Sequence, residues 1–241
     1  MENNNNEQKV ESNSGPKIST PTAIVIAGVL IMLGILASKG GLPEKAPKTI
    51  SEQVGVSKDK LLACITGTDL DALDAGINES VDRAMSHIPR EERGTPYSVV
   101  IGKDGIKTEI RGADSYASVK QIVDDALIGK VVIPYNGDLP EVIAGEHIFG
   151  NPDAIVTIVE YSDFECGYCK QYHPTLKKIV QESNGTVRWV YRHYPLHQHS
   201  FEKLVAANCV GQIKGNDAFW QYGDLLFGLL KTGNESVSEQ L

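Results

Sequence analysis

The spacing of apolar residues predicts alternating helices and strands in the first half of the chain. Between residues 57 and 84, apolar side chains recur at steps of three and four in two consecutive runs, which is the period of amphipathic helices. Short strands are predicted at 97–101 and 106–110, on either side of the hairpin turn Lys103-Asp104-Gly105. A further amphipathic helix is predicted from residue 114 or 115 to residue 127.

The same alternation continues in the second half of the chain. Residues 155–161, with the sequence IVTIVEY, are almost continuously β-branched, as in a central strand that is buried on both faces. A helical pattern follows at 172–180, then a strand at 187–191 and two further helical runs. Residues 129–150 carry several Pro and Gly residues, and we expect one short strand within a connecting segment there. Together these elements predict an α/β fold.

The N-terminal residues follow neither pattern. Residues 1–20 are rich in Asn, Ser and Glu, which is typical of a disordered tail. A charge-free apolar stretch then runs from Ala23 to Ala37, and we expect a single transmembrane anchor at 21–38. Residues 39–48, which contain Gly and Pro, are predicted to be a linker.

Such an anchor would contact the membrane through residues 22–38. The stretch is short for a spanning helix, so a cleaved signal peptide and a buried core helix stay open as alternatives. Lysines follow the stretch at positions 39, 45 and 48, and the positive-inside rule therefore gives no clear orientation.

Composition narrows the class of protein further. The chain has 241 residues, of which 41% are hydrophobic and 22% charged, an ordinary balance for a globular protein. The net charge of -8 and the absence of a long basic run exclude a nucleic-acid-binding surface, because phosphate binding needs clustered Lys and Arg.

Two of the four cysteines carry the strongest chemical pattern. Cys166 and Cys169 stand in the sequence Cys-Gly-Tyr-Cys, where the predicted central strand ends and a helix begins. Unpaired N–H groups at a helix N-terminus stabilise a thiolate, and the first cysteine of such motifs has a pKa of about 3.5–7. The two-residue spacer lets the second thiol attack a mixed disulfide formed by the first. The motif predicts a redox-active pair Cys166-Cys169 that needs no cofactor, with Cys166 as nucleophile and Cys169 as resolving thiol.

Other readings of the pair stay open. One pair of cysteines is half of a zinc site, and zinc usually needs a second pair; His173 is the nearest extra ligand. The alternative functions are therefore a non-enzymatic copper or zinc carrier and a redox-inactive module that binds a partner.

Longer stretches around the pair carry a family pattern. They are the segment from Val159 to Lys170 with Tyr172-His173-Pro174, the segment from Tyr191 to Leu196, and Gly94-Thr95-Pro96 before a strand. These stretches resemble the DsbA-like family of thioredoxin-fold thiol–disulfide oxidoreductases, over nearly everything from about residue 50 onward.

The resemblance implies a thioredoxin-like fold with a helical insertion. It implies protein thiols and disulfides as substrates and a membrane or soluble redox partner. A paired-cysteine active site fits better outside the cytosol, where disulfides persist, so with the anchor we expect an extracytoplasmic catalytic domain on a single-pass membrane protein. The direction of exchange, oxidase or isomerase, stays open. The histidines around Pro195, namely His193, His197 and His199, are interpreted through the resemblance as part of a structural loop rather than as a metal site.

The resemblance also implies roles for individual residues. Glu160 occupies the buried acid position beneath the cysteines, and Pro96 is the cis-proline that shapes the substrate groove, with Thr95 contacting sulfur and substrate. The alternatives are a solvent-facing glutamate and an ordinary strand-entry proline. A structural disulfide Cys64-Cys209 is implied as well, and two free buried thiols are its alternative.

The order of the elements departs from the family. The cis-proline half, 49–128, precedes the CxxC half, 151–241, whereas in the family it follows. We interpret 49–241 as one circularly permuted domain whose former termini are joined through 129–150. Two partial domains of a longer tandem, or halves that are completed by another chain, are the alternatives.

Overall fold

The computed structural model describes residues 48–230 of the chain. The disordered tail and transmembrane anchor expected at 1–20 and 21–38, with most of the linker, lie outside the described residues. Among residues 48–230, no helix is long and apolar enough to cross a membrane. The longest of them, α6 (Gly167–Glu182), has 16 residues and contains three lysines, whereas a span needs about 20 apolar residues. The expected fold class is corrected accordingly: the α/β architecture described below contains no spanning helix.

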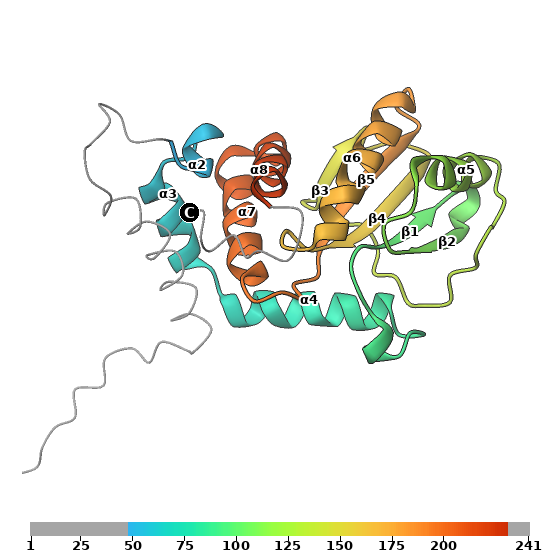
Figure 1. Cartoon of the computed structure of the whole chain (residues 1–241), viewed down its shortest axis with the longest axis horizontal. Coiled ribbons are helices and arrows are strands. Elements are labelled where there is room, and N and C mark those ends of the chain that lie inside the picture. The colour runs from blue at the N-terminus through green and yellow to red at the C-terminus, as the bar shows by residue number, and fades with distance from the viewer. Residues whose placement is uncertain (1–47, 231–241) are drawn as a thin grey trace, which may run out of the picture.

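A mixed sheet forms the centre of the described structure (Figure 1). Five strands stand in the order β2-β1-β4-β5-β3, where β4 and β5 are parallel and the other pairs antiparallel. All seven residues of β4 are buried, which fits its place in the middle of the sheet and its continuous β-branched sequence. The strands are β1 (Tyr97–Ile101), β2 (Lys107–Arg111), β3 (His147–Gly150), β4 (Val156–Ser162) and β5 (Val187–His193).

Helices cover the sheet and form a group beside it. Figure 1 shows α5 and α6 against the sheet, α4 running across the molecule, and α2, α3, α7 and α8 gathered on one side. Local sequence rules set several helix starts, since the Asp69 and Ser115 side chains accept backbone N–H bonds as N-caps of α4 and α5. The remaining bounds are α2 (Ile50–Gln53), α3 (Lys58–Gly67), α4 (Leu70–Ala84), α5 (Tyr116–Leu127), α7 (Ser200–Lys214) and α8 (Asn216–Leu229), with short 3-10 turns at Arg90–Glu92 and Lys103–Gly105.

The two halves of the chain share one sheet. The β1 strand pairs with β4 in an antiparallel ladder that runs from Tyr97 opposite Tyr161 to Ile101 opposite Thr157. A disulfide between Cys64 of α3 and Cys209 of α7, with an S–S distance of 2.02 Å, links residues 145 positions apart. One hydrophobic core therefore contains side chains from both halves.

Gly150 is required where β3 ends. Its φ is +99°, which L side chains rarely adopt, and a Cβ there would lie 2.6 Å from Val180 Cγ1 and 3.0 Å from the Val187 carbonyl oxygen. Glycine thus lets the backbone of β3 approach both α6 and β5 closely.

Candidate functional site

The junction between β4 and α6 places the two cysteines in different surroundings. Cys166 is the N-cap of α6, and its Sγ accepts a hydrogen bond from the Cys169 backbone N–H at 3.4 Å. Both are free thiols, and Cys166 is 4% exposed while Cys169 is fully covered. A small part of Cys166 is therefore accessible from the surface, whereas Cys169 is not accessible.

The same surroundings separate the acidities of the two thiols. A hydrogen bond from the Cys169 thiol, together with others from the Thr95 side chain and the first N–H groups of the helix, lowers the pKa of Cys166 to about 6, against the opposing effect of burial. Burial is the largest cause that raises the pKa of Cys169 well above its ordinary value, followed by the hydrogen bond with Cys166 and the charge of Glu160. Near neutral pH, Cys166 is thus the thiolate and Cys169 the thiol.

The loop before β1 lies against Cys166. The Thr95–Pro96 peptide bond is cis, and the Thr95 carbonyl oxygen lies 3.4 Å from Cys166 Sγ, where it accepts a hydrogen bond from the thiol when Cys166 is protonated. The sheet register explains this approach, because Tyr97 pairs with Tyr161 and the preceding residues therefore reach the end of β4. Residues about 70 positions apart meet at one sulfur.

Glu160 lies behind the cysteines in the centre of the sheet. The residue is 1% exposed, and its carboxylate oxygens make no direct hydrogen bond within the described part of the chain. Burial raises the pKa of Glu160 to about 8, although nearby Ser162 and Trp189 slightly favour its charged form. A carboxyl group with this pKa exchanges protons readily near neutral pH.

Two carboxylates that sequence reasoning did not single out fix the loop beside Cys166. Asp163 Oδ2 accepts hydrogen bonds from the backbone N–H groups of Leu196 and His197, at 2.8 and 3.2 Å, and from His197 Nδ1 at 2.7 Å. Glu165 accepts the His199 backbone N–H at 2.8 Å and forms a buried ion pair with Lys203. The sequence signal for them was the presence of two acidic residues, on either side of Phe164, directly before Cys166.

His173 and the remaining cysteines do not join the pair. His173 Nε2 lies 2.7 Å from Asp224 Oδ1 of α8, and Cys64 is bonded to Cys209. Over residues 48–230, no three His, Cys, Asp or Glu side chains are arranged to hold a metal ion.

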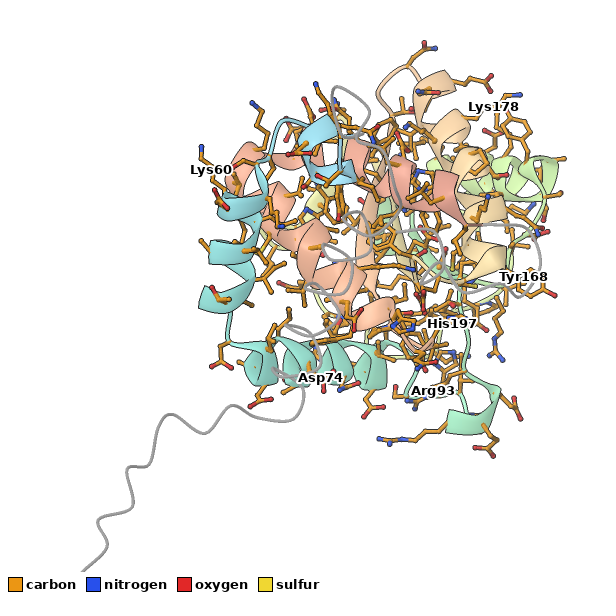
Figure 2. All side chains as sticks on the ribbon, turned by 60° about the vertical axis from the view of Figure 1, so that its left-hand side comes forward. Lys60, Asp74, Arg93, Tyr168, Lys178 and His197 are labelled. Atoms are coloured by element: carbon orange, nitrogen blue, oxygen red, sulfur yellow. A yellow bond between two sulfur atoms is a disulfide. The ribbon has the colours of Figure 1, made fainter. Side chains whose placement is uncertain are left out.

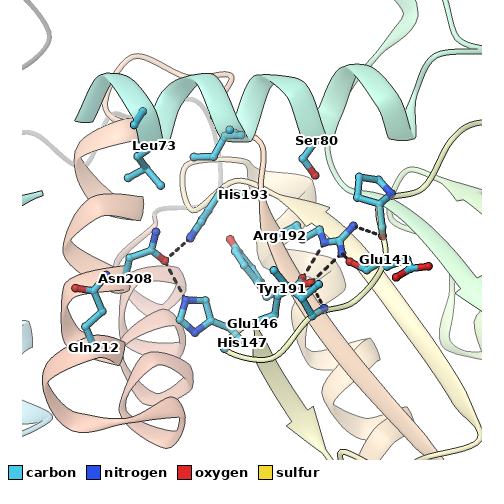
Figure 3. Close-up of a pocket in the computed structure, with 16 residues that line it drawn as sticks. Leu73, Ser80, Glu141, Glu146, His147, Tyr191, Arg192, His193, Asn208 and Gln212 are labelled. Atoms are coloured by element: carbon cyan, nitrogen blue, oxygen red, sulfur yellow. Dashed lines mark hydrogen bonds and ion pairs between the residues drawn. The ribbon is translucent and has the colours of Figure 1, made fainter. Parts of the chain in front are cut away.

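A hollow of about 550 Å³ lies apart from the cysteines, between α4, the segment before β3, β5 and α7 (Figure 3). Asn208 Oδ1 accepts hydrogen bonds from His147 Nε2 at 3.0 Å and His193 Nε2 at 2.8 Å. Arg192 donates to both carboxylate oxygens of Glu146, at 2.8 and 2.9 Å. Burial lowers the pKa of His193 to about 4, so this histidine is neutral. These polar groups pair with one another and tie the joining segment to β5 and α7.

Comparison with known proteins bears mainly on the second half. Residues 143–239 match a protein-family model described as thioredoxin. Two curated relatives are Na(+)/H(+) antiporter NhaA 1 of Salinispora arenicola, 38% identical over 81 residues, and NhaA 3 of Salinispora tropica, 39% identical over 82 residues. Each match covers 34% of this chain and 12% of the antiporter, so the chain corresponds to a small part of these relatives.

Two solved structures are also similar over part of the chain. DsbA2 of Pseudomonas aeruginosa is 36% identical with a TM-score of 0.34, covering 37% of this chain and 50% of that chain. Oxidised BdbD of Bacillus subtilis is 27% identical with a TM-score of 0.35, covering 39% of this chain and 53% of that chain.

Proposed function

With a DsbA-like, thioredoxin-family segment at residues 143–239 as the premise, we propose that this chain is a protein thiol–disulfide oxidoreductase. One observation carries the proposal: Cys166 is the N-cap of α6, where its Sγ accepts the Cys169 backbone N–H at 3.4 Å, while the Cys169 side chain is fully covered. This arrangement lowers the pKa of Cys166 to about 6 and raises that of Cys169. A reactive thiolate beside a protonated thiol within one turn of helix suits stepwise exchange.

The exchange runs in two balanced steps. The Cys166 thiolate attacks a disulfide of the substrate protein, which forms a mixed disulfide and releases one substrate thiolate. Cys169 then loses its proton and attacks Cys166 Sγ, which forms the Cys166–Cys169 disulfide and releases the second substrate thiolate. The substrate disulfide is reduced and the cysteine pair is oxidised; the same steps in reverse oxidise a substrate dithiol.

Glu160 is proposed as the proton acceptor for Cys169 in this reaction. It is a buried carboxyl group with a pKa of about 8, and its charge is one of the influences on the Cys169 thiol. A base at this depth is useful because bulk water does not reach Cys169, which is fully covered.

The substrate is proposed to bind across the cis-proline loop. Thr95 and Pro96 border Cys166, and two exposed apolar side chains belong to the adjoining segments. Tyr168, in the first turn of α6, is 67% exposed, and Leu196, in the loop bound to Asp163, is 47% exposed. An extended, partly apolar peptide fits such a surface. Main-chain groups of the loop would bind the peptide backbone, and the apolar side chains of the protein would contact the apolar side chains of the peptide.

We propose that residues 49–241 form one permuted domain and that it works outside the cytosol. Pairing of β1 with β4 and packing of Thr95 on Cys166 support the assembly of 49–128 with 151–241 through the segment 129–150. The Cys64–Cys209 disulfide supports the compartment, because such bonds persist in oxidising environments.

A trapping experiment tests the function. The Cys169→Ser variant lacks the resolving thiol. We therefore expect it to accumulate a mixed disulfide with a disulfide-containing model substrate such as insulin, visible on non-reducing gels. Cys166→Ser is the matched control and is expected to form none. Equal adducts on both variants would overturn the assignment of Cys166 as nucleophile. Stoichiometric copper or zinc in the purified protein, together with no adduct, would overturn the proposal in favour of a metal carrier.

A further inference from the structure

The loop before α7 places a titratable side chain on Asp163, the residue that also binds the backbone of the reactive cysteine. The Asp163 carbonyl oxygen accepts the Cys166 backbone N–H at 3.1 Å, and Asp163 Oδ2 lies 2.7 Å from His197 Nδ1. Cys166 and His197 are therefore held by one residue. In the view of Figure 2, His197 is labelled between Tyr168 and Arg93. In the sequence, Tyr168 follows Cys166 closely and Arg93 precedes Thr95 closely.

Asp163 fixes both the position and the donor atom of His197. The Asp163 side chain is fully covered, whereas that of His197 is 47% exposed. Because Asp163 Oδ2 also accepts the His197 backbone N–H at 3.2 Å, the main chain and the ring are held together. A carboxylate on Nδ1 orients an imidazole and favours its charged form.

The charges that face His197 come from three places. They are Asp163 at the end of β4, Cys166 at the start of α6, and Glu165 between them. Although partial burial opposes it, the hydrogen bond that the His197 ring donates to Asp163 and the attraction of these three groups raise the pKa of His197 above its ordinary value. Glu165 is already paired with Lys203, so Asp163 and the Cys166 thiolate are the charges that His197 balances.

We propose that His197 is an electrostatic positioning residue whose imidazolium, oriented by Asp163, stabilises the Cys166 thiolate and makes the Cys166–Cys169 pair a stronger oxidant. The inference rests on the proposed exchange function and deepens it. Stabilising the thiolate stabilises the reduced form of the pair, so the disulfide is more readily reduced. Loss of the imidazolium charge leaves the thiolate next to Asp163, whose negative charge is then unbalanced.

The His197→Asn variant tests the proposal, because its side-chain amide donates to Asp163 without a charge. We expect the Cys166 pKa, measured by pH-dependent alkylation, to rise so that the thiolate fraction near pH 6 falls about threefold, a modest effect for a half-exposed charge. The equilibrium constant for reduction by glutathione is expected to fall about threefold as well, or roughly 15 mV for this two-electron couple. His197→Lys, which restores the charge, is expected to recover most of both changes.

A reciprocal measurement uses the unaltered chain. If the thiolate attracts the imidazolium, the NMR-monitored pKa of His197 is higher in the reduced protein than in the protein with the Cys166–Cys169 disulfide. His199→Asn is the matched control, since the His199 ring faces Glu202 at 3.6 Å and its backbone bond to Glu165 is kept. This control is expected to leave the Cys166 pKa unchanged.

The outcomes separate the inference from the function. An unchanged Cys166 pKa in His197→Asn, or one His197 pKa in both redox states, would overturn the inference even in a chain that exchanges disulfides normally. A shifted Cys166 pKa in a chain that never exchanges would uphold the electrostatic pairing and overturn the function instead.

Discussion

At the cysteine pair, two residues of sequence separate two thiols whose pKa values are shifted in opposite directions. Cys166 receives N–H groups of α6 at its sulfur, while Cys169 lies one turn further into the core near Glu160. Helix geometry alone places N–H groups at the Cys166 sulfur, and the sequence indicates this position by a CxxC motif after a β-branched run. The burial of Glu160 is not visible in the same way, because all positions of a fully buried strand look alike.

Glu160 carries a pH-dependent prediction for stability. Between the unfolded pKa of about 4.5 and the folded pKa of about 8, the folded protein keeps a proton that the unfolded chain releases, so its stability falls as pH rises through this window. Glu160→Gln removes the effect. We expect the variant to gain on the order of 3–5 kcal/mol relative to the parent between pH 4 and pH 8.

Urea unfolding at both pH values measures this gain. Placing Cys166→Ser and Cys169→Ser in both proteins removes the titration of the thiols from the comparison. A constant difference between the two proteins across the pH range would mean that Glu160 is ionised in the folded state at pH 5.

At the scale of elements, the sequence predicted the kinds of structure and missed how distant ones meet. The hairpin strands and the central strand are confirmed, with shifts of one residue at most at their ends. The helix after the cysteines is confirmed as well, and it extends beyond the pattern at 172–180, from Gly167 to Glu182. The strand predicted at 106–110 begins at Lys107, and Ile155 lies just before β4. The hydrogen bonds of Asp163 to residues 196–197 depend on tertiary approach, which no local pattern encodes.

The end of β3 gives a prediction at this scale. Gly150→Ala combines a strained positive φ with a Cβ 2.6 Å from Val180 Cγ1, so we expect a loss of about 2–4 kcal/mol in the free energy of unfolding. Gly76→Ala in α4 is the matched control, because no atom lies within 4 Å of its added Cβ. Helix propensity predicts a gain of up to about 1 kcal/mol for that control. Equal stability of the two variants in denaturant titrations would contradict the assigned path of β3.

For the whole molecule, the assembly of the two halves of the chain was the property that local sequence patterns could predict least. Local patterns placed a strand at 97–101 and another at 155–161, and only the family resemblance suggested that they meet. In the structure the two strands are β1 and β4, paired side by side (Figure 1). The fold class is corrected in one respect: none of the helices within 48–230 is suited to span a membrane, and the segment 21–38 lies outside these residues.

We expect one copy of this chain to cycle reversibly between the dithiol and the disulfide of Cys166 and Cys169. The most direct measurement equilibrates the protein with reduced and oxidised glutathione over a range of protein concentrations, and counts alkylated Cys166 and Cys169 by mass spectrometry. We expect one two-electron transition, the same at every protein concentration, on the oxidising side of about -200 mV because the thiolate of Cys166 is stabilised. A pair that never reaches a reversible equilibrium would contradict the redox function, and a transition that shifts with protein concentration would contradict assembly of both halves within one chain.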